Sequence, residues 1–152
     1  MHYRIYLDVC CLNRPFGDQT QLRIHLETEA VISILQQCET KQWHLITSTP
    51  LEAEIAQIPD PEQLQQVRIA LSLASIKVSD SPALRARTSA LVKLGFSLYD
   101  AAHIANAEKA KADIFLSTDD RLVKRAKQLV SIISIKVDSP LPWLTAITDQ
   151  ES

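Results

Sequence analysis

Residues 95–120, GFSLYDAAHIANAEKAKADIFLSTDD, join a helical pattern to a strand pattern and place acids at two helix starts. The alanine-rich part predicts a helix over residues 98–111, and the apolar run IFLS after it predicts a strand. Asp100 stands in the first turn of that helix, and Asp119 and Asp120 follow the strand. Helix capping can explain each acid alone. A shared function therefore depends on which other acids the fold brings beside them.

The same alternation of strands and helices extends outward over most of the chain. Strands that alternate with helices form βα units, so the sequence predicts a single α/β domain with a central, mostly parallel sheet flanked by helices. We assign the domain to residues 1–147 and a short C-terminal tail to residues 148–152. The predicted strands are 4–7, 44–47, 114–117 and 132–137, with a weaker one at 76–78; the predicted helices are 21–39, 50–58, 61–74, 82–94, 98–111 and 121–129.

Composition excludes several classes of protein. The chain has 152 residues, 46% of them hydrophobic, which suits one domain with one core. Its net charge of -2 gives no overall positive field, so a polyanion would have to be held locally. The two glycines, Gly17 and Gly95, are too few and too far apart for a phosphate-binding loop or a dinucleotide fingerprint.

Cysteine usage and hydropathy predict a cytoplasmic protein. The three cysteines are odd in number and lack the spacing of a metal site, so we expect reduced thiols. The amino-terminal stretch MHYRIYLDVCC is not a secretory leader, and no run of about 18 apolar residues occurs. We therefore expect no membrane association.

Two carboxylates follow directly after predicted strands. Asp8 comes after RIYL and Asp119 after IFLST. The carboxyl ends of parallel strands share one edge of a sheet, where ligands of α/β proteins gather. These two acids should therefore lie at the same edge.

The segment STPLEAEI, after the strand at 44–47, separates two neighbouring glutamates. With Thr49 as N-cap and Pro50 at the first helical position, Glu52 completes a capping box and has a structural explanation. Glu54 instead falls within the apolar stripe of Leu51, Ile55 and Ile58. Burial of an uncompensated carboxylate costs free energy, so Glu54 is the acid that most requires a function.

A similar acid lies on the first long helix. Glu27 projects within the apolar arc of Leu26, Ala30, Val31, Ile34 and Cys38, whereas His25 and Glu29 point elsewhere. Carboxylates buried together raise one another's pKa unless a cation lies among them. Oxygen ligands favour Mg²⁺ or Mn²⁺ over zinc, so the acids together predict a divalent-metal site.

Structural explanations remain open for each residue. Ser97 and Asp100 can form a capping box, Asp8 can form an Asx turn, and Asp119 or Asp120 suits the positive end of the following helix. His103 is interpreted as a helix-surface or packed imidazole rather than a ligand. Jointly, the shared site is favoured, because four acids fall near helix starts at one sheet edge: Asp8, Glu54, Asp100 and Asp119.

Four segments, taken in order, resemble the PIN-domain ribonucleases, many of which are toxins of bacterial toxin–antitoxin pairs. IYLDVCCLNRPF is similar to the first strand of that family with Asp8, and LITSTPLEAEI to the segment with Glu54. LGFSLYDAAHIANA resembles the third acidic segment, with Asp100, and DIFLSTDDRL the last, with Asp119. The likeness spans nearly the whole chain.

Two positions depart from the family pattern or leave its register open. Cys10 replaces a residue that is often a hydroxyl or amide in the family, with Asn13 as a substitute contact. In STDDRL, aligning Leu122 with the usual aromatic makes Asp119 the fourth acid and Asp120 its neighbour.

The resemblance implies a Mg²⁺- or Mn²⁺-dependent endoribonuclease. It also implies an RNA substrate, an antitoxin partner and a homodimer, the last through the first helices, where Ile24, Ile32 and Leu35 widen the apolar arc. The implied catalytic and metal-binding residues are Asp8, Glu54, Asp100 and Asp119. The implied accessory or substrate-binding residues are Asn13, Arg14, Glu27, Asp120 and Arg121, with Lys124 and Arg125 as further cations near the edge.

Three other functions remain. A PIN-fold binding module with a vestigial site would keep the fold without activity. A phosphoacceptor signalling domain would need a lysine after a late strand, which Lys136 in SIKVDSP could supply. A haloacid-type phosphatase would need a second aspartate two residues after Asp8, where the chain has Cys10.

Overall fold

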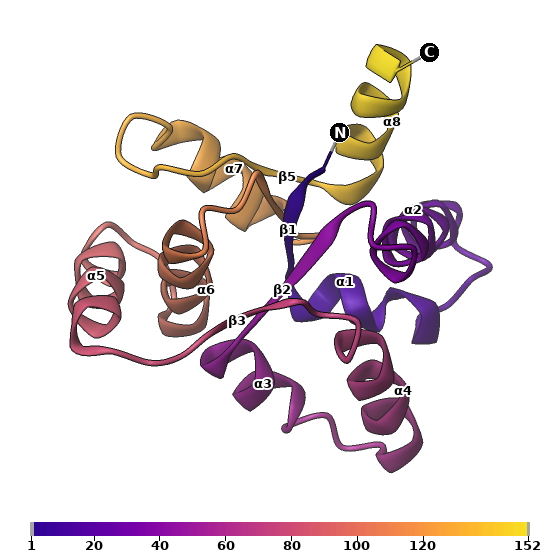
Figure 1. The fold of residues 1–152 in the computed structure, drawn as a ribbon, viewed down its shortest axis with the longest axis horizontal. Helices are drawn as coiled ribbons and strands as arrows, with labels where there is room; N and C mark the ends of the chain where they lie inside the picture. Colours follow the sequence, from indigo (N-terminus) through magenta and orange to yellow (C-terminus); the bar gives the residue numbers. More distant parts are fainter. Residues whose placement is uncertain (1, 152) are drawn as a thin grey trace.

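A computed structural model describes residues 2–151, and within them the chain forms a five-stranded parallel sheet in the order β3-β2-β1-β4-β5 (Figure 1). Every neighbouring pair of strands runs parallel. This confirms the predicted α/β domain with a central parallel sheet. The strands are β1 (Arg4–Leu7), β2 (His44–Ser48), β3 (Ile76–Val78), β4 (Ile114–Leu116) and β5 (Val137–Asp138).

The strand order creates a switch point between β1 and β4. The chain moves outward from β1 through β2 to β3, then returns to place β4 on the other side of β1. In open α/β sheets, ligands bind in the crevice beyond the carboxyl ends of the strands at such a point. Asp8 follows β1 and Asp119 lies three residues after β4, so the fold places both acids near this crevice.

Helices cover both sides of the sheet. Helices α5 and α6 pack together on one side, and α1, α2 and α4 lie on the other (Figure 1). No helix within residues 2–151 is long and apolar enough to cross a membrane. The helices are α1 (Val9–Asn13), α2 (Leu22–Glu39), α3 (Thr49–Ile55), α4 (Pro61–Leu71), α5 (Pro82–Lys93), α6 (Leu98–Lys109), α7 (Asp120–Gln128) and α8 (Pro140–Glu151), with a 3-10 turn η1 (Arg14–Phe16).

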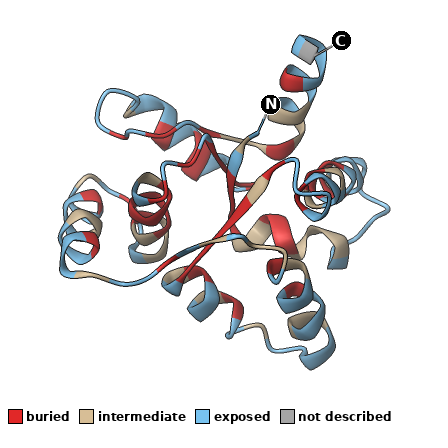
Figure 2. Cartoon of the chain, in the orientation of Figure 1, coloured by how far each residue is buried: buried red, intermediate tan, exposed pale blue. Residues whose placement is uncertain are grey.

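The central strands carry continuous apolar runs because both faces of the sheet are covered. Ile5, Tyr6 and Leu7 of β1 are fully buried, as are Leu45 and Ile46 of β2 (Figure 2). The core therefore fixes β1 and β2 rigidly beneath the acids that follow them.

An aromatic cluster closes the amino end of the sheet. Tyr3 meets the rings of Trp43 and Trp143 edge-on, each at 5.4 Å between centroids, and the two tryptophan rings lie 5.5 Å apart. Trp143 belongs to α8, which was not predicted from the sequence. The domain boundary at residue 147 stays a prediction, although α8 continues past it to Glu151.

The predicted strand at 132–137 was largely wrong, because only Val137–Asp138 pairs in the sheet. The preceding backbone bonds elsewhere: the Ile132 carbonyl accepts from Arg87, and the Ser134 amide donates to Glu108. The burial of Ile133, Ile135 and Val137 explains the misleading alternation. Distant side chains thus satisfy backbone groups that a strand would have used.

Two local predictions were also wrong. Ser48, not Thr49, caps α3, because its hydroxyl accepts from the Leu51 amide at 3.3 Å. Glu52 therefore falls one position beyond a capping box, and its carboxylate lies 3.6 Å from Lys77 on the surface. Leu26, expected in the buried arc of α2, is 39% exposed.

Candidate metal centre

Asp8 is held rigidly at the end of β1. Its amide donates to the Leu116 carbonyl at 2.9 Å, which extends the pairing of β1 with β4. One carboxylate oxygen, Oδ1, accepts from the Val9 amide and caps α1, and Oδ2 accepts from the Ser117 hydroxyl at 2.9 Å. Burial raises the pKa of this carboxyl, and repulsion from Glu54 adds to the rise against the lowering effects of His103 and Ser117. The site therefore holds an acid that is costly to ionise without a cation.

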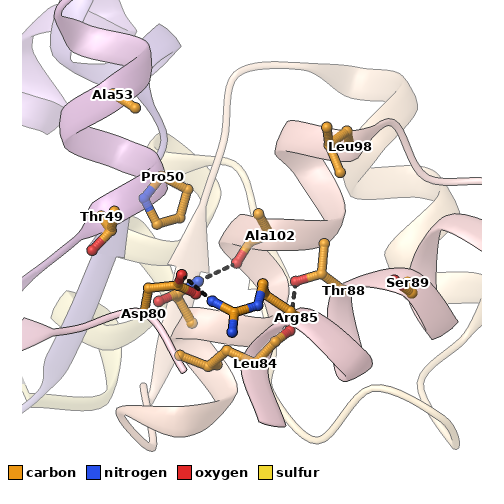
Figure 3. A pocket seen from close by; sticks show the side chains of 11 residues that line it. Thr49, Pro50, Ala53, Asp80, Leu84, Arg85, Thr88, Ser89, Leu98 and Ala102 are labelled. Carbon is orange, nitrogen blue, oxygen red and sulfur yellow. Dashed lines mark hydrogen bonds and ion pairs between the residues drawn. The ribbon is translucent and has the colours of Figure 1, made fainter. Parts of the chain in front are cut away.

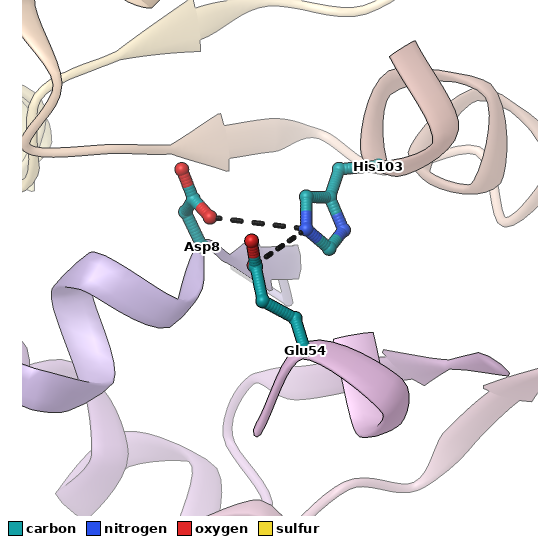
Figure 4. Close-up of side chains that lie close together, drawn as sticks. All are labelled: Asp8, Glu54 and His103. Carbon is teal, nitrogen blue, oxygen red and sulfur yellow. Dashed lines mark hydrogen bonds and ion pairs between the residues drawn. The ribbon is translucent and has the colours of Figure 1, made fainter. Parts of the chain in front are cut away.

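Glu54 reaches the same place from α3. Its Oε1 lies 2.9 Å from Nε2 of His103, and that nitrogen lies 4.0 Å from Oδ1 of Asp8 (Figure 4). One ligand atom from each of the three residues falls within 4.8 Å of the others. The core-facing stripe predicted for α3 is confirmed at Leu51 and Ile55, both buried. The register of α3 therefore aims Glu54 at the sheet edge.

His103 is fully buried, which confirms a packed imidazole and rules out a helix-surface one. Its Nδ1 lies 2.7 Å from the Tyr6 hydroxyl, and that hydroxyl lies 2.6 Å from the hydroxyl of Ser48. Burial and nearby carboxylates raise the pKa of Tyr6 far above its usual range, so its hydroxyl stays protonated. The neutral hydroxyl of Tyr6 therefore lies beside Nδ1 of His103, and the hydroxyl of Ser48 lies next to that of Tyr6.

We call the four predicted acids, Asp8, Glu54, Asp100 and Asp119, the acidic edge; within residues 2–151, Asp100 and Asp119 are not part of the group of ligand atoms that meet within 4.8 Å. Asp100 lies in the first turn of α6, where Ser97 caps the helix by accepting from the Asp100 amide. Burial raises the pKa of Asp100, and repulsion from Asp8 and Asp119 adds to the rise. Asp119 caps α7 through Oδ1, which accepts from the amides of Arg121 and Leu122. Asp119 is thus the N-cap of α7, whereas at Asp100 the observed bond is that of its amide to Ser97, which is half of the predicted capping box.

Asp120 is held by a different partner. Both of its carboxylate oxygens accept from Arg23, at 2.7 and 2.8 Å. Arg23 also lies 3.4 Å from Glu27, whose Oε1 accepts from Arg14 at 2.9 Å. The buried Glu27, expected to be accessory to the site, is thus paired between two arginines. Repulsion from Asp119 is one cause of the raised pKa of Asp100, and the choice of Asp119 over Asp120 as the fourth acid stays a prediction.

Asn13, predicted as an accessory contact near Asp8, has another partner in the structure. The side-chain oxygen of Asn13 accepts from Gln63 at 3.0 Å, whereas the hydroxyl beside Asp8 comes from Ser117. Cys10 lies close by, since its sulfur accepts from the Thr118 amide at 3.3 Å. A hydrogen bond with Cys11 lowers the pKa of the Cys10 thiol despite its burial. The hydroxyl beside Asp8 is therefore that of Ser117, the residue directly after β4, and the role expected of Asn13 stays a prediction.

The cations expected at the edge divide into two groups. Arg121 and Lys124 are exposed on α7, and Arg121 adjoins Asp119 and Asp120 in its first turn. Arg125 donates to the Leu94 carbonyl and packs against Gly95, whose positive φ of 104° suits a glycine. Arg125 thus supports the α5–α6 connection, and Arg121 stays a candidate for contact with substrate.

Sequence reasoning missed Tyr6, Ser48 and Ser117 as parts of the site. A tyrosine within a buried strand signals a hydroxyl that needs a partner. Likewise, a serine at the carboxyl end of a strand is placed to contact a neighbouring edge residue. These signals could identify polar support for the site but not the residues it supports.

A separate hollow of about 370 Å³ lies between α3, α5 and α6 (Figure 3). Pro50, Ala53 and Leu98 give it an apolar lining, and an ion pair between Asp80 and Arg85 stands at its edge. None of the four predicted acids lines it. The hollow and the four predicted acids are therefore separate features of the structure.

Comparison with known proteins supports the fold. No protein-family model and no curated protein sequence matches the chain. The crystal structure of FitAcB from Neisseria gonorrhoeae is similar, with a TM-score of 0.55 and 18% identity over 90% of this chain and 97% of that one. The structure of PAE2754 from Pyrobaculum aerophilum has a TM-score of 0.55 and 14% identity over 99% of this chain and 100% of that one. These likenesses support a PIN-like fold and carry nothing further about activity.

Proposed function

We propose that the chain is a metal-dependent endoribonuclease with Asp8, Glu54, Asp100 and Asp119 as its catalytic and metal-binding residues. The observation that carries the proposal is the meeting of Asp8, Glu54 and His103 within 4.8 Å beside the switch point of a parallel sheet. Burial raises the pKa of Asp100, and repulsion from Asp8 and Asp119 adds to the rise, which supports including Asp100 and Asp119 in the proposal. A PIN-like fold and an acidic cluster together fit a nuclease.

The residues present suit a divalent cation. Burial raises the pKa of both Asp8 and Asp100, and neighbouring carboxylates add to both shifts. A cation held among these oxygens would reverse the repulsion, and oxygen donors match Mg²⁺ or Mn²⁺. When bound, such an ion supplies a Lewis acid that acidifies water and neutralises charge on a phosphate. The protein's contribution is to hold the carboxylates rigidly, through α1 for Asp8 and α3 for Glu54.

An RNA substrate would be bound by local cations, because the net charge of the chain is -2. Arg121 is exposed in the first turn of α7, next to Asp119. Arg14 and Arg23 share Glu27, and a phosphate could compete for either guanidinium. We therefore propose that phosphates lie along the η1–α2–α7 side of the site. Cleavage of cellular RNA would place the protein in the cytoplasm.

One of the other functions loses support from the sheet. The flavodoxin-like order of phosphoacceptor domains is 2-1-3-4-5, whereas this sheet is ordered 3-2-1-4-5. Lys136 precedes β5, and its carbonyl accepts from Phe115, so it lies before the carboxyl edge of the sheet. A haloacid-type phosphatase would need a second aspartate at the position that Cys10 occupies. A vestigial binding module remains the alternative, and a cleavage assay distinguishes it from a nuclease.

We also propose that α2 forms an interface with a second copy of the chain or with an antitoxin. Leu22 and Ile32 are 71% and 37% exposed on this helix, and Leu26 is exposed as well. Exposed apolar residues grouped on one helix are typical of a contact surface. Light scattering at tens of micromolar should show a dimer that Leu22→Glu weakens. A wild-type monomer under those conditions would contradict the homodimer and leave the antitoxin to be tested by co-purification.

The activity is tested by incubating the purified chain with RNA and Mg²⁺ or Mn²⁺. We expect RNA cleavage that EDTA abolishes, with DNA duplex largely untouched. Glu54→Gln should abolish cleavage, because its carboxylate contacts His103 inside the cluster. Glu52→Gln is the matched control: two residues away, it makes only a surface contact with Lys77 and should keep full activity.

Three results would contradict the proposal. Equal loss of activity from both glutamate variants would show that the cluster at Glu54 is not the site. Cleavage that persists in EDTA would show that the activity does not depend on a metal ion. No metal-dependent cleavage of any RNA, with an intact fold, would favour the vestigial module.

A further inference from the structure

The acidic edge contains a nitrogen donor that the oxygen-only site predicted from sequence lacks. Nε2 of His103 lies 2.9 Å from Oε1 of Glu54 and 4.0 Å from Oδ1 of Asp8. Two ligands on opposite sides of one ion lie at most about 4.4 Å apart, since each stands near 2.0 to 2.2 Å from it. Both measured distances fall within this limit. The distance from the imidazole nitrogen to each carboxylate is therefore compatible with two ligands of one ion.

The groups behind the imidazole suit a ligating histidine. Such a histidine almost always donates its other ring N–H to an oxygen, which fixes the ring and the tautomer. Here Nδ1 faces the Tyr6 hydroxyl at 2.7 Å, and that hydroxyl can in turn donate to Ser48 at 2.6 Å. Without an ion, the 2.9 Å contact has Nε2 donate to the Glu54 carboxylate; with an ion bound, Nδ1 would carry the proton and the lone pair of Nε2 would be free for the ion. The hydroxyl pair permits this change of tautomer, because the Tyr6 hydroxyl can either donate to Nδ1 or accept from it while donating to Ser48.

Aromatic rings hold the imidazole plane in place. Tyr99 stacks on His103 with an interplanar angle of 21°, and Phe115 meets it edge-on at 88°. The imidazole is also completely buried. A surface histidine would lose side-chain entropy on binding an ion, whereas this ring is already ordered. The packing of β1, β4 and α6 has therefore positioned the nitrogen before any ion arrives.

We infer that His103 is a metal ligand through Nε2 and that the resulting nitrogen–oxygen centre prefers Mn²⁺ to Mg²⁺. Imidazole suits transition metals, whereas Mg²⁺ is bound through oxygen ligands and keeps several waters. The inference rests on the metal centre in the proposed function and adds its donor set and selectivity. It also reverses the sequence-based interpretation of His103 as a residue without a ligand role.

The test is pulsed electron paramagnetic resonance of the full chain loaded with Mn²⁺. We expect coupling between the ion and ¹⁴N, replaced by the ¹⁵N pattern when the protein is made with ¹⁵N-labelled histidine. His103→Gln should abolish the coupling and weaken Mn²⁺ binding by about tenfold or more, while the Kd for Mg²⁺ changes less than about twofold. His25→Gln, on the exposed face of α2, is the matched control and should change neither.

A second variant keeps the test valid if His103→Gln fails to fold. Tyr6→Phe retains the ring shape but removes the hydroxyl that faces Nδ1. It should keep the nitrogen coupling and weaken Mn²⁺ binding by up to about tenfold. Calorimetric titrations with Mn²⁺ and Mg²⁺ measure both affinities without reference to cleavage.

The outcomes separate this inference from the proposed function. Tightly bound Mn²⁺ without nitrogen coupling would overturn the inference, because His103 would then only orient Glu54, and the nuclease would stand. Nitrogen-coupled Mn²⁺ in a protein that cuts no RNA would support the ligand and overturn the nuclease. Failure to bind either ion would overturn both.

Discussion

Helix α6 carries a carboxylate at each end, and the two have opposite electrostatic environments. Asp100, in the first turn, has its pKa raised by burial and by repulsion from Asp8 and Asp119. Glu108, in the last turn, is also raised by burial, but Arg87 and Ser134 outweigh that effect and lower its pKa overall. Arg87 donates to both Glu108 oxygens, at 2.9 and 3.0 Å. The carboxylate in the last turn of α6, Glu108, is paired with Arg87, whereas the carboxylate in the first turn, Asp100, is repelled by neighbouring carboxylates.

The difference shows how to separate structural acids from functional ones. Glu108 joins α5, α6 and the segment before β5, so its carboxylate contributes to the fold. Asp100 and Asp8 reduce the stability of the metal-free protein, because each holds a carboxylate where ionisation is penalised. Under the proposed function, such acids would bind a cation from solution. Substitution at the acidic edge should therefore change cleavage and metal binding, whereas substitution at the Glu108 end of α6 should change the free energy of unfolding.

The largest expected effect is at the acidic edge. Asp8→Asn should reduce RNA cleavage about 100-fold or more and remove most of the rise in Tm on adding Mn²⁺. Its metal-free Tm should stay equal or rise, because a buried penalised carboxylate is removed. Asp113→Asn, at the amino end of the sheet where Asp113 accepts from the Arg4 amide, should keep full cleavage. A metal-induced Tm shift unchanged in Asp8→Asn would end the assignment of Asp8 as a ligand.

The next effect is at the other end of α6. Arg87→Gln should cost about 2 kcal/mol of unfolding free energy, because it leaves the half-buried Glu108 without its cation. Cleavage should be unchanged at temperatures where the variant is folded. Arg85→Gln breaks the exposed pair with Asp80 and should cost less than about 0.5 kcal/mol in urea unfolding. Loss of activity in folded Arg87→Gln would break the proposed separation of the two ends.

A smaller effect is expected where the acidic edge and the helix cap coincide. Ser97→Ala removes the hydroxyl that accepts from the Asp100 amide and should cost about 1 kcal/mol. Cleavage should fall little, because Asp100 keeps its place in the first turn. Ser81→Ala, which removes the equivalent cap of α5, should cost a similar amount and serves as the comparison in thermal melts. Complete loss of cleavage in Ser97→Ala alone would give the hydroxyl a role beyond capping.

The smallest effect is the pH dependence of the metal-free protein. The raised pKa values of Asp8 and Asp100 contribute stability that is present below their unfolded-state pKa, near 4, and is lost as pH rises through the folded-state pKa. The lowered pKa values of Glu108 and Asp120 act oppositely, since their contribution is lost as pH falls. The net slope should thus be shallow. Subtracting the urea-unfolding curve of Asp8→Asn should expose the first contribution, and an unchanged difference from pH 4 to 8 would contradict it.

The sequence predicted what local patterns determine. The runs RIYL and HLIT became β1 and β2 because both faces are covered, and acids after strands reached one edge because the strands are parallel. The segment at 132–137 could not be predicted, because Arg87 and Glu108, which bind its backbone, are far away in the chain. Where local pattern and tertiary contact disagree, the contact determines the structure.

The site was predictable to the same extent. The pairing of Asp8 with the edge that contains Glu54 followed from strand ends and helix register. The partners of His103 did not, because the pattern of α6 carries no information on the tyrosine and serine that face it from β1 and β2. The one-residue error at the α3 cap arose because Ser48 and Thr49 are both preferred N-cap types and stand next to each other, with Ser48 the stronger of the two.

The aromatic cluster at the amino end of the sheet makes the chain's intrinsic fluorescence a local signal. Both tryptophans of the sequence, Trp43 and Trp143, belong to it, and Trp143 is carried by α8. Their emission therefore reports whether α8 is packed against the amino end of the sheet, which is the end opposite to the four acids. If emission and far-ultraviolet circular dichroism give the same unfolding midpoint, α8 melts with the sheet as one cooperative unit. An earlier midpoint in emission would identify α8 as a helix that detaches first.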